Sequence, residues 1–198
     1  MVETVPAGRR ERKKAATRQT IVDAALELIV ARGFDAVSVR EIADRADVSP
    51  TTVFAHFPQK EALLFYEEHG QRDRLVAAVS SRPADRSLSD ALKEYFRSEH
   101  RAMWSSGDGV LRERIMAVIG ETPSLQDYAS RMWVRHEDAL AGAIAGELGL
   151  SAPTNEIRLY SRFALQIQLS VTSDTDPVLD EGFDLLDRGW AHYRQSVG

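Results

Sequence analysis

The chain has 198 residues, of which 43% are hydrophobic and 28% are charged, and its formal net charge is −5. This composition is typical of a soluble globular protein with one sizeable core or two small ones. The absence of cysteine excludes disulfides and thiolate metal sites. The sequence has no apolar run long enough for a signal peptide or a membrane span, so we expect a cytoplasmic protein with no membrane partner.

Charge is distributed unevenly along the chain. Residues 1–20 carry six basic and two acidic side chains, a balance of +4, whereas residues 61–198 carry 15 basic and 22 acidic side chains, a balance of −7. One interpretation is a basic segment that binds a polyanion, joined to an acidic domain that does not. A solvated basic tail with no partner fits the charge equally well.

The N-terminal third of the chain begins with a segment that lacks apolar periodicity. Residues 1–14 contain Pro6 and Gly8, and we expect a flexible basic arm there. From Thr17 onward, apolar residues recur at helical spacing, which predicts a helix ending near Arg32 with Gly33 as its C-cap.

The stretch of residues 38–60, SVREIADRADVSPTTVFAHFPQK, predicts two short helices joined by a tight turn. Ser38 and Glu41 match a capping box at the start of the first helix. Ser49 before a proline matches an N-cap at the start of the second. The second helix ends at Phe57, because the residue before a proline is disfavoured in the helical region. Two capped helices this close must cross steeply, and the small Ala43 suits that contact, so the pattern indicates a helix-turn-helix.

The outward side chains of the second short helix favour DNA binding over an ordinary helical hairpin. A hairpin needs the same caps, but it does not need short outward residues that would let a helix enter a groove. In this helix those residues are Thr51, Thr52, Ala55 and His56.

The remainder of the chain predicts further helices and no strand, so the expected fold class is all-α. A long helix is expected from residue 59 toward 79, followed by a linker at 81–87 and helices near 88–104, 110–119 and 125–148. Two final helices, about 155–172 and 177–197, carry apolar stripes that step by three and four residues.

The segments ARGFDAVSVREIADRADVS and VFAHFPQKEALL resemble the TetR family of bacterial transcriptional repressors. The resemblance implies an N-terminal three-helix helix-turn-helix DNA-binding domain, residues 15–60, after the basic arm 1–14. It also implies a C-terminal helical ligand-binding and dimerisation domain, residues 61–198, with a homodimer formed through the last two helices. The implied function is a repressor that a small molecule releases from a palindromic DNA operator.

The resemblance also implies which residues contact DNA, with Ser38 and Lys60 expected at phosphates. Three positions depart from the family pattern. Phe54 stands where a tyrosine hydroxyl usually meets a phosphate, Asp47 stands where glycine is frequent, and Ala55 can pack only on a thymine methyl group. We therefore expect sparse base reading, with phosphate contacts and DNA shape supplying much of the recognition. The expected DNA-binding residues are Ser38, Arg40, Ser49, Thr51, Thr52, Phe54, His56 and Lys60.

For the C-terminal domain, the resemblance implies an apolar cavity for an unknown small apolar or amphipathic ligand. Taken singly, the aromatic, methionine and polar candidates fit an ordinary core better than a ligand site. The candidates are Phe96, His100, Met103, Trp104, Met116, Tyr128, Met132, Trp133, His136, Phe163 and Gln166.

The sequence predicts no catalytic residue, metal site or cofactor, and we expect a protein that is not an enzyme. A helical enzyme is the first alternative, but no nucleophile motif, HExxH motif or glycine-rich phosphate loop supports it. The second alternative is an interaction module whose helix-turn-helix has lost DNA binding, with Phe54 and Asp47 as marks of that loss.

Overall fold

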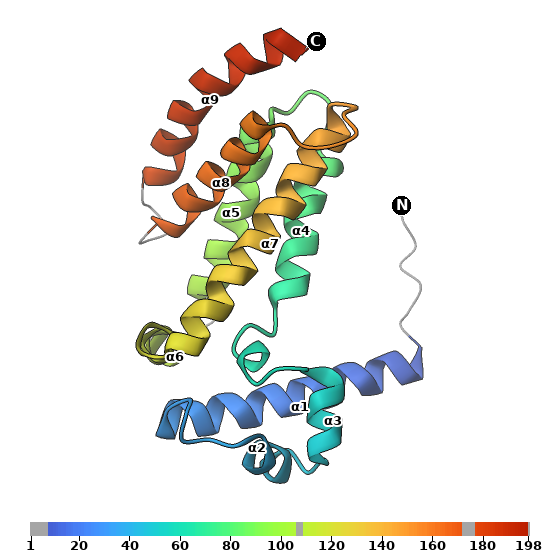
Figure 1. Cartoon of the computed structure of the whole chain (residues 1–198), viewed down its shortest axis with the longest axis vertical. Helices are drawn as coiled ribbons and strands as arrows, with labels where there is room; N and C mark the ends of the chain where they lie inside the picture. The colour runs from blue at the N-terminus through green and yellow to red at the C-terminus, as the bar shows by residue number, and fades with distance from the viewer. Residues whose placement is uncertain (1–7, 106–108, 172–176, 198) are drawn as a thin grey trace. The chain divides into compact units, whose positions relative to one another are not determined.

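The structure is a computed structural model and describes residues 8–105, 109–171 and 177–197 (Figure 1). All regular secondary structure in these ranges is helical, which confirms the all-α class. None of the helices found there is long and apolar enough to cross a membrane. The helices are α1 (Arg9–Arg32), α2 (Val39–Arg45), α3 (Pro50–His56), the 3-10 helix η1 (Glu61–Leu63), α4 (Glu68–Ser80), α5 (Leu88–Ser105), α6 (Gly109–Glu121), α7 (Pro123–Glu147), α8 (Asn155–Leu169) and α9 (Val178–Val197).

The described residues pack as two compact units, which we call the head unit and the body unit. The head unit contains the described residues of Met1–Tyr66 together with Val110–Ala129. The body unit contains those of Glu67–Gly109 and of Ser130–Gly198. The expected C-terminal domain, 61–198, therefore includes two stretches, 61–66 and 110–129, that pack with the head unit.

The head unit has a hydrophobic core of its own. Helix α2 packs against both α1 and α3 (Figure 1), and three apolar residues of α6 pack on the same core. Burial of each large apolar side chain contributes about 1.5–3 kcal/mol to folding, so this core accounts for the compactness of the unit. Its most deeply buried members are Ile21, Val22, Ala25, Ile29, Val37, Ile42, Ala43, Val53, Leu63 and Leu125.

Helix α1 begins earlier than the sequence pattern predicted. Residues 9–14 were expected in a flexible arm, but they form the exposed first turns of α1. Arginine, lysine, glutamate and alanine all have high helix propensity, so this segment extends a helix without needing an apolar face. The part of the expected arm at 1–7 lies outside the described residues.

The helix expected from residue 59 toward 79 is interrupted. A single 3-10 turn at Glu61–Leu63 is followed by turns at 64–67, and α4 begins only at Glu68. The Tyr66 carbonyl accepts a hydrogen bond from the Arg18 guanidinium, and the backbone bonding of α4 starts one residue later, from Gln71 N–H to the Glu67 carbonyl. Hydrophobic periodicity alone does not distinguish such a turn from a continuous helix.

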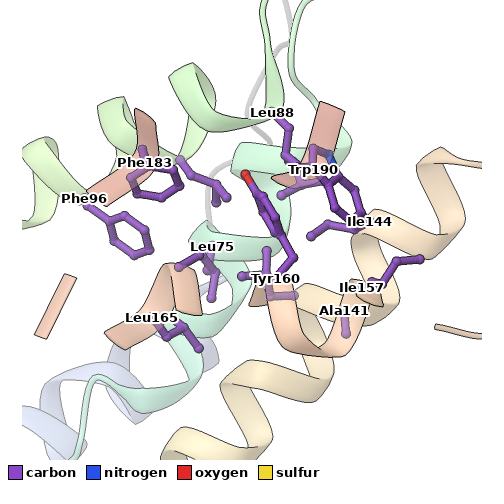
Figure 2. Packing of buried hydrophobic residues seen from close by; sticks show 14 of the residues in the cluster. Leu75, Leu88, Phe96, Ala141, Ile144, Ile157, Tyr160, Leu165, Phe183 and Trp190 are labelled. Carbon is purple, nitrogen blue, oxygen red and sulfur yellow. The ribbon is translucent and has the colours of Figure 1, made fainter. Parts of the chain in front are cut away.

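The body unit is built around a second hydrophobic core, in which α4, α5, α7, α8 and α9 each bury one face (Figure 2). Two aromatic pairs lie within it. The rings of Tyr160 and Trp190 are 4.5 Å apart between centroids, and those of Phe96 and Phe183 are 6.1 Å apart. The buried Ser89 hydroxyl pairs with the Tyr160 hydroxyl at 2.8 Å, which satisfies two polar groups in an apolar setting.

The apolar stripes of the last two helices pack within this core. Ile157 and Tyr160 of α8, and Phe183 and Trp190 of α9, are all buried in the same chain. The two helices approach closely, because a Cβ atom at Gly182 would lie 2.8 Å from Ile167 Cγ2. The stripes thus explain packing inside one protomer, and any contact with a second protomer must use the remaining outward faces.

Candidate nucleic-acid interface

A reciprocal cap fixes the start of α2. The Ser38 hydroxyl accepts a hydrogen bond from Glu41 N–H at 3.2 Å, and Glu41 Oε2 accepts from both the N–H and the hydroxyl of Ser38 at 2.8 Å each. Glu41 Oε1 also accepts from Arg32 Nη1 at 2.7 Å. The two hydrogen bonds from Ser38, followed by the one from Arg32, lower the pKa of Glu41 to about 2. The predicted capping box is confirmed, and it occupies the hydroxyl that was expected to contact a phosphate.

The turn between α2 and α3 depends on one left-handed residue. Asp47 has φ 53°, and no other non-glycine residue in the described part of the chain has a positive φ. Val48 N–H donates to the Ala43 carbonyl at 3.0 Å, and Asp47 N–H donates to the Asp44 carbonyl at 3.4 Å. This pair of bonds is a Schellman motif, in which the left-handed position is usually glycine. Asp47 thus adopts the left-handed conformation at a position where the family frequently has glycine.

At the start of α3, two hydroxyl groups pair with each other. The Ser49 hydroxyl accepts from Thr52 N–H at 3.1 Å and lies 2.8 Å from the Thr52 hydroxyl. Pro50 follows at the first helical position. The predicted N-cap is confirmed, and it means that Ser49 and Thr52 hydrogen-bond within the helix end in the DNA-free protein.

Helix α3 has one buried and one exposed face. Val53 and Phe57 are 1% and 2% exposed and belong to the head core. Thr51 and Ala55 are exposed on the other face, and the Phe54 ring is 50% exposed between them. Beyond Pro50, the exposed side chains of α3 are therefore Thr51, Phe54 and Ala55, while Thr52 and His56 are half-buried.

Arg18 of α1 holds the far end of α3. Its Nη1 donates to the carbonyl of His56, the last residue of α3, at 3.0 Å, and its Nη2 donates to the Tyr66 carbonyl at 2.8 Å. Its guanidinium carbon lies 4.1 Å from the centre of the Phe57 ring. We call this set of contacts the Arg18 clamp. The sequence analysis missed it, because its partners lie 38 and 48 residues away and leave no local pattern.

His56 shares the electrostatic environment of this clamp. Burial, followed by the positive charges of Arg18 and Lys14, lowers the pKa of His56 below its ordinary value of 6.5. A phosphate close to the ring would act in the opposite direction, because an opposite charge favours the charged form.

Lys60 points toward its own chain in the DNA-free protein. Its Nζ donates to the Phe34 carbonyl at 2.5 Å and lies 4.0 Å from the centre of the Phe34 ring. Burial lowers its pKa. Lys60 thus fastens η1 to the turn after α1, and its expected phosphate contact stays a prediction. Arg40 is exposed on α2.

The ligand candidates occupy different environments. Phe96, His100, Met132 and His136 are buried in the body unit, where His136 Nδ1 bonds the Met132 carbonyl at 2.9 Å and His100 Nε2 lies 3.3 Å from Gln168 Nε2. These four candidates are therefore packed side chains of the body unit, and neither of the two clefts described below is lined by them.

The other candidates are exposed or belong elsewhere. Met116 and Phe163 are 59% and 50% exposed, and Gln166 is also exposed, so an enclosed cavity does not surround them. Tyr128 stacks on Phe65 in the head unit, with ring centroids 5.0 Å apart. Trp133 is half-buried with its ring 5.6 Å from that of His136. The side chains of Met103 and Trp104 lie outside the described residues.

Two clefts in the body unit are lined by residues that the sequence analysis did not single out. The first, of about 230 Å³, lies between α7 and α8 and is lined by Val134, Glu137, Asp138, Arg158, Leu159 and Arg162. The second, of about 420 Å³, is formed by the α4–α5 connection, the end of α7 and Trp190. Both carry charged side chains at their rims.

The capped helices, the left-handed turn and the exposed face of α3 define a helix-turn-helix protein. Residues 21–66 match the model for bacterial regulatory proteins of the tetR family, and residues 86–191, more than half of the chain, match the MftR C-terminal domain. The chain belongs to the TetR family of bacterial regulatory proteins.

Individual relatives are similar over most of the chain. It is 31% identical over 147 residues to the HTH-type transcriptional regulator TcmR of Streptomyces glaucescens, a match that covers 72% of this chain and 65% of TcmR. It is 27% identical over 138 residues to MftR of Mycobacterium tuberculosis, covering 70% of this chain and 69% of MftR. The matched region thus spans slightly less than two thirds of the length of TcmR.

Solved structures share the fold. NalD, the secondary repressor of the MexAB-OprM multidrug efflux pump in Pseudomonas aeruginosa, aligns over 89% of this chain and 97% of its own, with a TM-score of 0.59 and 17% identity. GusR of Salmonella enterica aligns over 86% of this chain and 93% of its own, with a TM-score of 0.56 and 22% identity. At these identities the likeness concerns the fold alone.

Proposed function

We propose that the protein is a sequence-specific DNA-binding transcriptional repressor that binds a palindromic operator as a homodimer and is released by a small molecule. The observation that carries the proposal is the exposed face of α3, held in a capped helix-turn-helix with its opposite face fully buried. A helix presented in this way can enter the major groove of DNA.

Positive charge on the head unit supports a polyanionic partner. The first turns of α1 present Arg9, Arg10, Arg12, Lys13 and Lys14 on an exposed helix. Lysine and arginine near phosphates release condensed counterions, which is the main source of sequence-independent affinity for DNA. A helix places these charges in fixed register along one element, whereas a flexible arm would not.

The homodimer would use the outward faces of α8 and α9. Leu159, Phe163 and Leu169 of α8 and Leu185 of α9 are between 45% and 68% exposed. Large apolar side chains gathered on adjacent helices are unusual on a monomeric surface and mark sites of association. A second copy of the chain also satisfies the operator symmetry, since two recognition helices must meet half-sites about 34 Å apart.

Ligand release would act through the segments that join the units. The chain passes between head and body at 66–67, 109–110 and 129–130. The Arg18 clamp holds the carbonyl of Tyr66, immediately before the first of these points. A ligand that binds the body better in one arrangement would move this segment and with it α3. Linkage then requires operator DNA to weaken ligand binding by the same factor.

A binding titration against salt tests the DNA-binding function. We expect log Kd on a selected duplex to rise steeply with log salt concentration, with an affinity well above that for random DNA at the same salt. Binding with no preference among sequences, or no binding, would instead favour an interaction module that has lost DNA recognition.

A further inference from the structure

The Phe54 ring is an exposed aromatic group on the outward face of α3. Half of its surface is accessible to solvent, while its helix neighbours Val53 and Phe57 are almost completely buried in the head core. Exposing apolar area to water is unfavourable in proportion to that area. Packing of the ring on an apolar group of a partner would therefore lower the free energy of the complex.

The surroundings of Phe54 limit what that group can be. Thr51 and Ala55 lie one turn and one residue away on the same exposed face, and both offer methyl groups. The hydroxyls of Ser49 and Thr52 lie 2.8 Å apart at the helix N-cap, so one of their two hydrogens is already engaged within the helix end. The Arg18 guanidinium lies against Phe57 and two backbone carbonyls instead of the groove-facing side. The exposed side chains around Phe54 therefore offer more carbon than hydrogen-bonding atoms.

In the major groove of DNA, the apolar group that carries sequence information is the C5-methyl of thymine. We infer that Phe54 reads a thymine methyl group in each half-site and thereby sets sequence preference at that position. The inference rests on the proposed DNA-binding function and adds a chemical determinant to it. Phe54 acts here as a specificity-determining residue, in place of a tyrosine hydroxyl bonded to a phosphate.

Uracil substitution isolates the methyl group. Duplexes recovered by selection from a random pool are resynthesised with uracil replacing one thymine at a time, which removes the C5-methyl and leaves every hydrogen-bonding atom in place. Fluorescence anisotropy then gives Kd for each duplex at low salt, where phosphate contacts keep all variants bound. We expect at least one thymine per half-site whose replacement weakens binding about fourfold, the effect of uncovering one methyl group.

The variants Phe54→Ser and Phe54→Leu assign that effect to Phe54. Because about half of the residue is buried, Phe54→Ser should lower the melting temperature modestly and Phe54→Leu less, so binding is measured well below both transitions. On the uracil duplex, the affinity of wild type should be about fourfold lower than on the thymine duplex. The affinity of Phe54→Leu should fall less, and that of Phe54→Ser should hardly differ between the two duplexes. At the same position, 5-methylcytosine should give wild type a higher affinity than cytosine does. For Phe54→Ser, 5-methylcytosine and cytosine should give the same affinity.

Other outcomes overturn the inference. If uracil weakened the binding of wild type and Phe54→Ser equally, the methyl contact would belong to another residue. If no uracil replacement changed Kd, the protein would make no such methyl contact. In both cases the protein would still bind its selected duplex, so the DNA-binding function would stand. Failure to enrich any duplex would overturn the proposed function itself.

Discussion

Replacing Arg18 with methionine tests whether the Arg18 clamp positions the recognition helix. Methionine keeps most of the aliphatic stem but removes the charge and both donors. The lost contacts are two charge-assisted hydrogen bonds, to the His56 and Tyr66 carbonyls, and one cation–π contact with Phe57. The change therefore detaches the end of α3 and the start of the connection to α4 from α1.

The size of the effect follows from these contacts. A hydrogen bond from a charged donor contributes about 1.5–3 kcal/mol, and a cation–π contact contributes about 0.5–2 kcal/mol. The site is only partly buried, and contacts of one group are not additive, so we expect Arg18→Met to lower the free energy of unfolding of the head unit by about 2–4 kcal/mol. Arg18→Lys should lose about half as much, because an ammonium can keep the ring contact and reach one carbonyl.

Chemical denaturation followed by circular dichroism measures the loss, and anisotropy with a selected duplex measures the effect on DNA binding. Arg10→Met is the matched control, since Arg10 lies exposed on the same helix, and its stability should stay within about 0.5 kcal/mol of wild type. If Arg18→Met denatures at the same concentration as wild type, the clamp does not hold the head unit together and the reasoning is wrong.

Three further changes test other parts of the account. Asp47→Gly should stabilise the protein by about 0.5–1 kcal/mol, because glycine adopts the left-handed turn without strain, and Asp47→Val should destabilise it; equal midpoints of denaturation for both variants would contradict this. The pKa of His56 is lowered in the free protein, so the stability linked to it is present above about pH 6.5 and is lost as the pH falls through the folded value. DNA phosphates should raise that pKa, so operator affinity should increase as the pH is lowered from about 8 to about 6. His56→Gln should flatten this dependence of affinity on pH. If the dependence were unchanged in the variant, His56 would not be the group that titrates. Leu159→Glu should convert dimers into monomers in analytical ultracentrifugation with unchanged helix content, whereas Val110→Glu, at a more exposed apolar residue on α6, should not; a dimer that survives Leu159→Glu would place the interface elsewhere.

Local sequence signals predicted the helix-turn-helix in detail. The Ser38–Glu41 box, the Ser49 cap and the C-cap at Gly33 all involve atoms within a few residues of each other. Such features follow from side-chain chemistry and backbone sterics, so a single sequence carries the information for them.

Features set by long-range contacts were not predictable in the same way. The Arg18 clamp joins residues 38 and 48 positions apart, and it accompanies the break before α4 that the apolar pattern around Leu63 concealed. The stripe containing Tyr160 showed that α8 buries one face, but periodicity gives no indication of whether the partner is the same chain or a second one. Tyr128 packs on Phe65 for a similar reason: the head unit recruits part of α7 from a distant part of the sequence.

Selection of bound duplexes from a random pool tests the central claim most directly. If two copies of α3 read an operator together, the enriched sequences should form an inverted repeat whose half-site centres lie about 10 base pairs, or a multiple of that spacing, apart. Enrichment of a single unrepeated site, or no enrichment over the starting pool, would contradict a dimeric repressor that reads DNA through α3.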